Sequence, residues 1–235
     1  MFPLRSVKAV LLDVDGTLYR QAPVRLRIGL EMMKFFLVTL SPIKLVRLIR
    51  GILCFRRSRE RLRAVGRPSS SLEELQFSEP ARELGEDPAR FRDTVLEWML
   101  QRPLRHVAKA RRRGVSKFLR LLEAREIKAG AFSDYPVIDK LKALHLDGHF
   151  SVTLCATDSE INAFKPHPAG YLRACEIWNL NPWEVLYIGD RPEVDAAGAH
   201  AAGMPCLIIG VKNGASGYCG VRSFDELCHA FENSR

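Results

Sequence analysis

The second half of the chain alternates short apolar runs with segments in which apolar residues recur every three or four positions. Short apolar runs bounded by turn residues are typical of buried strands, and the longer period is typical of amphipathic helices. Regular alternation of the two predicts an α/β fold, in which a parallel sheet has helices on both faces. The predicted elements are, in order, the helix 115–124, strand 127–132, helix 137–144, strand 150–155, helix 168–178, strand 185–188, helix 193–202 and strand 205–209.

A further apolar run, residues 7–12, ends abruptly in the turn Asp13-Val14-Asp15-Gly16-Thr17. We assign this run to the same sheet, which places both acids at the carboxyl end of a strand, where open α/β sheets bind their ligands. Two carboxylates crowded at one point repel each other unless a cation or a proton intervenes, so the pair indicates a metal site. The competing interpretation is that this acidic stretch merely closes a turn.

Residues 19–112 lack the alternation of strands and helices, and their pattern predicts an inserted, mainly helical domain. Residues 27–55 have helical spacing with a break at Ser41-Pro42. Asp87-Pro88 predicts another helix start, and that helix is expected to run to about residue 100, with Pro103 interrupting it.

We therefore expect an α/β core made of residues 1–18 and 113–235, with a helical cap over residues 19–112. The formal net charge is +9, and the positive charge is concentrated in the cap: residues 20–67 contain thirteen Lys or Arg and two Asp or Glu, 13 − 2 = +11. Localised positive charge favours an anionic substrate or an anionic surface as the partner of this region.

The basic segment 44–63 has two interpretations. No uncharged run in the cap is long enough to span a bilayer, but a basic amphipathic helix can lie on an anionic membrane. The simpler interpretation is a cap helix that packs its apolar stripe against neighbouring helices.

The six cysteines are scattered, and none belongs to a C-x-x-C pair. This spacing favours reduced thiols over a disulfide framework or a zinc knuckle. The first predicted strand begins within a few residues of Met1, which leaves no room for a cleaved signal peptide. We therefore expect a soluble, cytoplasmic protein.

Further polar residues lie beside the ends of predicted strands, namely Ser133, Lys165, Asp190 and Asp195. Each alone has an ordinary explanation, since Ser133 fits a helix cap, Lys165 a solvated loop and Asp190 the start of a helix. The carboxyl ends of parallel strands meet at one edge of a sheet, so all of them are expected beside the acidic turn.

Together these residues resemble the four motifs of the haloacid dehalogenase-like (HAD) hydrolase superfamily. The match consists of Asp13-Val14-Asp15-Gly16-Thr17-Leu18, Ser133, Lys165-Pro166-His167-Pro168 and Gly189-Asp190-Arg191-Pro192-Glu193-Val194-Asp195. The resemblance covers about residues 5–18 and 115–212, and it implies a Rossmann-like parallel sheet. It does not reach the insertion, whose position after the first motif is similar to that of a helical C1-type cap.

The resemblance implies a phosphatase in which Asp13 attacks phosphorus and forms an aspartyl phosphate. Asp15 would protonate the leaving alcohol and then deprotonate the hydrolytic water. Ser133 would bind a phosphoryl oxygen, and Lys165 would offset the negative charge around Asp13.

The same resemblance implies a Mg²⁺ ion held by the Asp13 carboxylate, the Asp15 backbone carbonyl and Asp190. Asp195 would be an outer or alternative ligand. The resemblance implies a small-molecule phosphate ester as the substrate, and the basic cap favours an anionic ester that is small or lipid-linked.

The acid at position 15 separates the branches of this superfamily. Dehalogenating members lack it, which favours a phosphate ester, although a phosphomutase uses the same acid/base pair. A phosphonate-cleaving relative would need a cap lysine, and nothing marks Lys34 or Lys44 for that role.

A second class of function is a binding protein on a HAD scaffold, with residues 44–63 against an anionic membrane. Nucleic acid is disfavoured because no surface aromatics alternate with the arginines.

Overall fold

The computed structural model describes residues 6–211 and 219–233, and these ranges contain a six-stranded parallel sheet. The strands lie in the order β3-β2-β1-β4-β5-β6, so that the first strand of the chain lies between β2 and β4. This arrangement confirms the predicted α/β fold. The strands are β1 Ala9–Leu12, β2 Lys128–Ser133, β3 Val152–Cys155, β4 Val185–Gly189, β5 Cys206–Ile209 and β6 Cys219–Val221.

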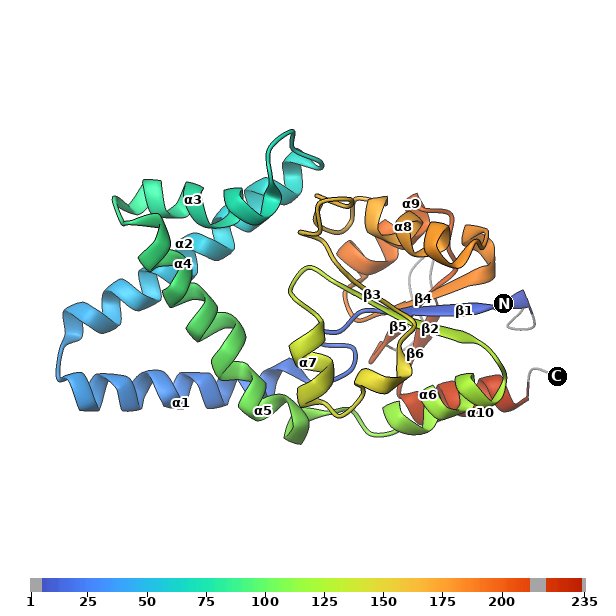
Figure 1. Ribbon diagram of the computed structural model, residues 1–235. Helices are drawn as coiled ribbons and strands as arrows, with labels where there is room; N and C mark the ends of the chain where they lie inside the picture. The colour runs from blue at the N-terminus through green and yellow to red at the C-terminus, as the bar shows by residue number, and fades with distance from the viewer. Residues whose placement is uncertain (1–5, 212–218, 234–235) are drawn as a thin grey trace.

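Helices pack on both faces of this sheet. They are α6 Val115–Ala124, α7 Ile138–Ala143, α8 Ala169–Trp178, α9 Ala197–Ala201 and α10 Phe224–Glu232, with the short turns η3 Asp147–His149, η4 Pro182–Glu184 and η5 Pro192–Ala196. In Figure 1, α6 and α10 lie on one face, and α8 and α9 lie on the other. Every residue of β1 is buried, because a parallel strand is covered on both sides.

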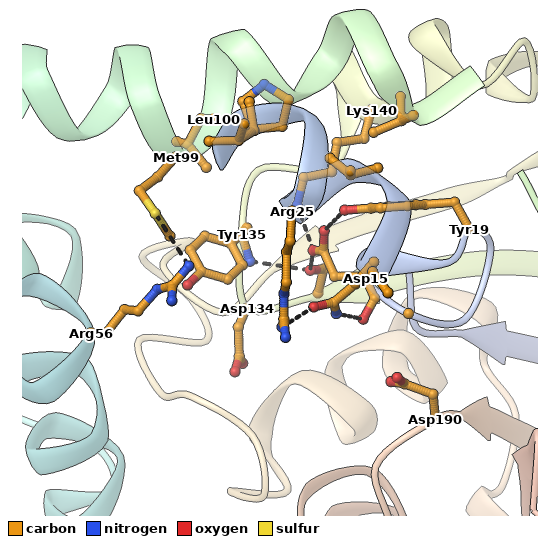
Figure 2. A pocket seen from close by; sticks show the side chains of 18 of the residues that line it. Asp15, Tyr19, Arg25, Arg56, Met99, Leu100, Asp134, Tyr135, Lys140 and Asp190 are labelled. Carbon is orange, nitrogen blue, oxygen red and sulfur yellow. Dashed lines mark hydrogen bonds and ion pairs between the residues drawn. The ribbon is translucent and has the colours of Figure 1, made fainter. Parts of the chain in front are cut away.

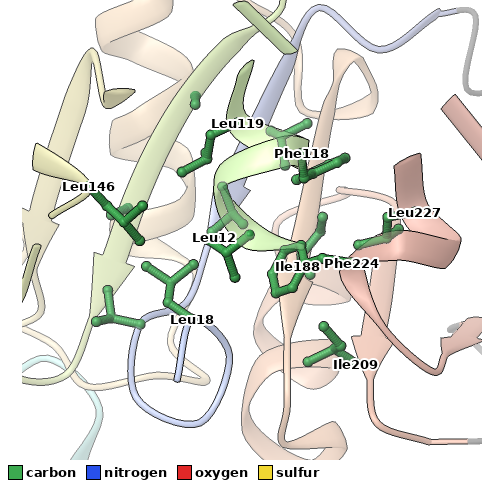
Figure 3. Close-up of a cluster of buried hydrophobic side chains, with 14 of the residues drawn as sticks. Leu12, Leu18, Phe118, Leu119, Leu146, Ile188, Ile209, Phe224 and Leu227 are labelled. Atoms are coloured by element: carbon green, nitrogen blue, oxygen red, sulfur yellow. The ribbon is translucent and has the colours of Figure 1, made fainter. Parts of the chain in front are cut away.

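The alternation of β1 side chains divides the core into two clusters. Val10 and Leu12 pack on the side of α6 and α10, and Leu11 packs on the side of α8. Figure 3 shows the first cluster, in which Phe118 of α6 lies beside Phe224 of α10, with ring centroids 5.6 Å apart. The end of β1, and therefore the acidic turn after it, is fixed by packing from both faces.

The helices of the insertion lie between β1 and β2 in the sequence and extend to one side of the sheet in Figure 1. They are α1 Gln21–Thr39, α2 Pro42–Val65, α3 Leu72–Leu84, α4 Pro88–Val95, the π-helical turn η2 Leu96–Gln101 and α5 Arg102–Ala110. The break predicted at Ser41-Pro42 is observed, since Leu40 is left-handed and the Ser41 hydroxyl accepts the Lys44 N–H at 3.3 Å. The division into a core and a cap over residues 19–112 remains our proposal.

The structure corrects several predicted elements. Pro103 does not interrupt a helix, because it lies in the first turn of α5, where the missing N–H of proline is tolerated. The helix predicted over residues 193–202 is divided into η5 and α9, and the strand predicted from residue 150 begins at Val152. The sequence pattern predicts nothing beyond residue 209, where the structure adds β6 and α10.

All six cysteines are free thiols, in agreement with their scattered spacing. Within the described ranges, no helix combines the length and the apolar character needed to cross a membrane.

Candidate active site

The carboxyl ends of neighbouring strands bring the predicted site residues together. Asp13 directly follows β1, Ser133 is the last residue of β2, and Asp190 directly follows β4. The Asp13 N–H donates to the Ile188 carbonyl at 2.9 Å, which continues the pairing of β1 with β4 into the acidic turn. Gly16 has a φ of +109°, and a Cβ at this position would lie 2.0 Å from Asp190 Oδ2, so the turn requires glycine.

Lys165 lies at the centre of a buried network of charges. Its Nζ donates to Asp13 Oδ1 at 2.6 Å, to Asp195 Oδ1 at 2.7 Å and to the Tyr187 hydroxyl at 3.1 Å. Burial alone would lower the pKa of Lys165, but the charges of Asp13 and Asp195 outweigh burial and raise this pKa well above its ordinary value. Lys165 is therefore a fixed cation beside Asp13.

Asp195 accepts hydrogen bonds on both of its oxygens. Oδ1 accepts from Lys165 and, at 2.9 Å, from the Tyr187 hydroxyl. Oδ2 accepts the backbone N–H groups of Asp190 at 3.1 Å and Arg191 at 2.9 Å. Because each oxygen already has two donors, the geometry favours Asp195 as a residue that positions Lys165 and the turn after β4.

Among the carboxylates of the site, that of Asp190 has the fewest hydrogen-bond partners. Its Oδ1 is buried and has no hydrogen-bond partner among the described residues. One oxygen from each of Asp13, Asp190 and Asp195 lies within 4.8 Å of the others. This cluster is the place in the described part of the chain where carboxylates gather closely enough to hold a metal ion.

The pKa values of these acids reflect crowded negative charge. Burial, with the charge of Asp195 adding to it, raises the pKa of Asp190 to about 6. Burial also raises the pKa of Asp13 well above its usual value; Lys165 opposes this shift, and the neighbouring aspartates add to it. A divalent cation would relieve this repulsion, and carboxylate oxygens are the ligands that Mg²⁺ prefers.

The second aspartate of the turn is held by a separate set of donors. Asp15 Oδ2 accepts from Ser133 Oγ at 2.9 Å and from Lys140 Nζ at 2.5 Å, and its Oδ1 accepts from the Tyr19 hydroxyl at 2.5 Å. The Gln21 side chain donates to the Asp15 backbone carbonyl. Burial acts to raise the pKa of Asp15, but the charge of Lys140 and the hydrogen bonds outweigh burial and lower this pKa. Asp13 and Asp15 therefore face different partners.

Sequence reasoning missed two of these donors. Lys140 lies on α7 and is 7% exposed, and the sequence shows only that a lysine lies in the first helix after Ser133. Tyr19 lies in the segment that the sequence analysis assigned to the cap, and nothing in its spacing indicates a contact with Asp15. Ser133, for which a phosphoryl contact is expected, donates to Asp15 in this structure.

Two arginines of α2 connect the cap helices to the site. Arg63 Nη1 lies 2.9 Å from Asp134 Oδ2, and Arg63 also donates to the Lys165 carbonyl. Arg59 is 3% exposed, donates to the Asp134 carbonyl at 2.8 Å, and places its guanidinium carbon 4.0 Å from the centroid of the Tyr135 ring. These two members of the basic segment pack against the core, which the sequence pattern did not indicate.

A cleft of about 1280 Å³ lies between the sheet edge and the cap helices. Asp13, Asp15 and Asp190 line one end, and side chains from α1, α2, η2 and α5 line the other. Figure 2 shows Asp15 and Asp190 on one side of the cleft, and Arg56 and Met99, from α2 and η2, on the other. The cleft therefore joins an acidic end at the sheet to an end built by the cap helices.

The chain matches the family model described as haloacid dehalogenase-like hydrolase over residues 7–203. Because this match covers most of the chain, the protein belongs to the haloacid dehalogenase-like hydrolase family. The match includes the insertion, which the motif resemblance alone did not cover.

The individual proteins that the chain resembles share either a short matching segment or a low overall sequence identity. A phosphoglycolate phosphatase from Mannheimia succiniciproducens is 38% identical over 74 residues, which are 32% of this chain and 31% of that protein, so the match spans less than one third of the relative's length. A 2-haloacid dehalogenase structure from Pseudomonas syringae pv. tomato has a TM-score of 0.67 and 20% identity, covering 97% of this chain and 100% of the other. The magnesium-bound HAD hydrolase YfnB from Bacillus subtilis has a TM-score of 0.65 and 18% identity, covering 96% and 99%. At such low sequence identity, the similarity to these two structures shows that the fold is shared.

Proposed function

We propose that the protein is a Mg²⁺-dependent phosphatase that hydrolyses a phosphate monoester through an aspartyl phosphate on Asp13. The observation that carries this proposal is the different surroundings of the two aspartates, since Asp13 faces Lys165 and Asp190, whereas Asp15 faces Lys140. A nucleophile and an acid/base need separate surroundings because they must differ in protonation at the same pH. In the structure the pKa of Asp13 is raised by burial and that of Asp15 is lowered by Lys140, which is the reverse of what the two roles require. Both roles therefore require that the pKa of Asp13 falls when Mg²⁺ is bound and that Asp15 separates from Lys140. Membership of the HAD-like hydrolase family and the partial likeness to a phosphoglycolate phosphatase support it.

In the first step, a carboxylate oxygen of Asp13 attacks phosphorus, and the bond from phosphorus to the ester oxygen breaks. Asp15 gives its proton to the leaving alkoxide, which departs as an alcohol. Lys165 balances the charge around Asp13, and Ser133 turns from Asp15 to a phosphoryl oxygen. Asp15 acts as an acid only after it leaves Lys140, because that contact favours its ionised form.

In the second step, Asp15 takes a proton from a water molecule whose oxygen attacks the phosphorus of the aspartyl phosphate. The bond between phosphorus and the Asp13 oxygen breaks, which releases inorganic phosphate and restores the carboxylate. Asp15 ends the cycle protonated, so that the next leaving alkoxide receives the proton that this water supplied. The sum of the two steps is the hydrolysis of one ester by one water molecule.

The residues present fit a Mg²⁺ ion, because Asp190 keeps a buried oxygen without a partner inside a cluster of carboxylates. We assign the carboxylates of Asp13 and Asp190 and the backbone carbonyl of Asp15 as its ligands. Asp195 would hold Lys165 and the backbone of Asp190 in place. Bound Mg²⁺ supplies charge neutralisation for the phosphoryl group and the attacking carboxylate.

The test is release of inorganic phosphate from a panel of phosphate esters in Mg²⁺ and in EDTA. The panel includes sugar phosphates, nucleotides, phosphoglycolate, and isoprenoid and lipid phosphates. We expect release that requires Mg²⁺ and that falls at least about 10³-fold in Asp13→Asn, because the nucleophile is lost. Asp93→Asn is the matched control, since it makes the same chemical change at an exposed position of α4 and should leave the rate unchanged.

A folded protein that releases no phosphate from any ester of the panel contradicts the proposal. Conversion of a sugar phosphate into its isomer without release of phosphate would instead identify a phosphomutase, which uses the same pair of aspartates. The two outcomes are separated by measuring free phosphate and the sugar products in the same reaction.

A further inference from the structure

The far end of the cleft is apolar and is built by the cap helices. It is lined by Ile28 and Met32 of α1, Ile49, Ile52 and Leu53 of α2, and Trp98 of η2. Ile49 and Leu53 are 41% and 45% exposed, although the opposite end of the same cleft is acidic. Contiguous exposed apolar side chains in a cleft indicate that an apolar part of a ligand covers them.

The floor of this apolar end is firmly packed. Leu48, Ile52 and Trp98 are buried together, and residues of α1 pack against them. The ring of Phe35 lies edge-on to Trp98, with centroids 5.5 Å apart. The groove between α1 and α2 is therefore a preformed surface, and covering it costs little rearrangement.

Two arginines, Arg25 of α1 and Arg56 of α2, bring positive charge into the same cleft. Both line the cleft, and in Figure 2 both side chains extend into it. Arg25 contacts the Gln21 side chain, and Arg56 lies 3.8 Å from the Met99 sulfur; neither has a carboxylate partner in the described part of the chain. They are therefore available to an anionic or polar group of a ligand.

We propose, on the basis of the phosphatase function above, that the substrate is the phosphate monoester of a long-chain amphiphile. Its phosphate lies at Asp13, its polar linkage lies beside Arg25 and Arg56, and its hydrocarbon chain lies along α1 and α2. The cleft, at about 1280 Å³, exceeds the roughly 300–1,000 Å³ typical of pockets for drug-sized ligands. A short polar ester would leave Ile49 and Leu53 in water.

The test compares butyl phosphate with dodecyl phosphate below the critical micelle concentration of the longer ester. Titration calorimetry with the Asp13→Asn variant measures binding without turnover, and we expect dodecyl phosphate to bind at least about tenfold more tightly because it buries more methylene groups. In Leu53→Asp this ratio should fall to about one. Val65→Asp introduces the same charge at an exposed position of α2 outside the cleft, and it should keep the ratio.

Equal binding of the two esters, or an equal ratio in Leu53→Asp and Val65→Asp, overturns the long-chain substrate and leaves the phosphatase function untouched. Preferential binding of dodecyl phosphate by a protein that hydrolyses neither ester would overturn the assignment of the long-chain ester as substrate, whereas the phosphatase function is overturned only if no ester of the panel above is hydrolysed.

A second surface, independent of the cleft, lies where α1 and α2 meet. We define the hairpin tip as residues 33–46. Its apolar side chains are largely in water, with exposures of 60%, 84%, 76% and 78% for Leu37, Val38, Leu40 and Ile43, and the last three are the most exposed large apolar side chains of the described chain. Water-exposed apolar side chains gathered at the end of a projecting hairpin indicate a contact surface.

The chain through the hairpin tip carries only positive charges, although Glu86 from the segment after α3 lies beside it. Residues 32–59 contain seven Lys or Arg and no Asp or Glu. Arg47 pairs with Glu86 at 2.6 Å, whereas Lys34, Lys44 and Arg50 form no ion pair with any described residue. Apolar side chains flanked by unpaired cations are complementary to a bilayer with anionic headgroups.

We infer that the hairpin tip docks on an anionic lipid surface. Vesicles of phosphatidylcholine with and without phosphatidylglycerol are sedimented with the protein at low and high salt. We expect binding that requires phosphatidylglycerol and weakens with salt, and that falls at least about tenfold in Val38→Asp/Ile43→Asp, because apolar contact and electrostatic attraction are both reduced. Val65→Asp should bind like the parent protein.

Two results contradict membrane docking. One is the absence of association with either kind of vesicle at low salt. The other is a dimer, measured by light scattering, that Val38→Asp/Ile43→Asp converts to a monomer while vesicle binding stays unchanged. That second result would identify the hairpin tip as a contact between two copies of the chain.

Discussion

The sheet edge around Asp13 and the hairpin tip differ in the burial and the pairing of their side chains. At the sheet edge, Asp13 and Lys165 are buried, and their charged atoms have close partners. At the hairpin tip, Val38 and Ile43 are 84% and 78% exposed, and the nearby Lys44 is unpaired in the described structure. A rigid site whose charged groups are held by many hydrogen bonds suits one reaction, whereas an exposed apolar surface suits contact with a partner.

Beyond loss of the nucleophile itself, the largest expected effect comes from removing the cation of the sheet edge. Lys165→Met should lower phosphate release at least about 10²-fold, because charge compensation at Asp13 is lost. It should also lower the free energy of unfolding by about 3–5 kcal/mol, because Asp13 and Asp195 would stay buried without their partner. Urea denaturation and phosphate release measure the two effects. Lys142→Met, at an exposed position of α7, is the control, and equal behaviour of the two variants would show that the network is dispensable.

A second contrast concerns packing. Leu12, at the end of β1, is fully buried, so Leu12→Ala should lower the free energy of unfolding by about 2–5 kcal/mol through lost contacts and a cavity. Val38→Ala should change it by less than about 0.5 kcal/mol, because this side chain is in water. Thermal or urea unfolding compares the two variants. A loss at Val38 as large as that at Leu12 would mean that the hairpin tip is covered in solution.

A third prediction concerns the cluster of acids. Asp190→Asn should raise the Mg²⁺ concentration needed for half-maximal phosphate release at least about tenfold, because a ligand is lost. In EDTA the same variant should unfold at the same temperature as the parent protein or a higher one, since it removes a charge from crowded carboxylates. An unchanged Mg²⁺ requirement would exclude Asp190 as a metal ligand.

The smallest effect is expected from the ion pair beside the hairpin tip. The Arg47 side chain is 69% exposed, so Arg47→Gln should lower the free energy of unfolding by less than about 1 kcal/mol despite its distance of 2.6 Å from Glu86. The difference should shrink at high salt. Lys44→Gln removes an unpaired cation as the control, and a loss of about 2 kcal/mol or more at Arg47 would show that this pair holds α2 to the segment that follows α3.

The sequence predicted the elements whose signal is local. Buried parallel strands read as apolar runs, and the side chains after them meet at one edge of the sheet, which is why Asp13, Ser133 and Asp190 could be placed together. Element ends were less accurate, as with the strand expected from residue 150 that begins at Val152. Pro103 was misjudged because its effect depends on its position within a helix.

Contacts between segments far apart in the sequence could not be predicted. Arg59 and Arg63 belong to a basic stretch, but their partners Asp134 and Tyr135 follow β2, more than seventy positions later. Lys140 likewise has no local signal that connects it with Asp15. Such pairs depend on where the cap helices lie on the core, and no periodicity within one helix contains that information.

By itself, the sequence determined the α/β core and the residues that carry the motif resemblance, because strand composition and motif spacing are properties of short stretches of chain. Only the tertiary structure decided that Asp13 and Asp15 face different partners, that Asp195 has both oxygens occupied, and that an apolar cleft continues from the acids along α1 and α2. These features depend on which side chains of distant elements meet. Burial and hydrogen bonding then determine which groups are saturated and which remain available to a ligand.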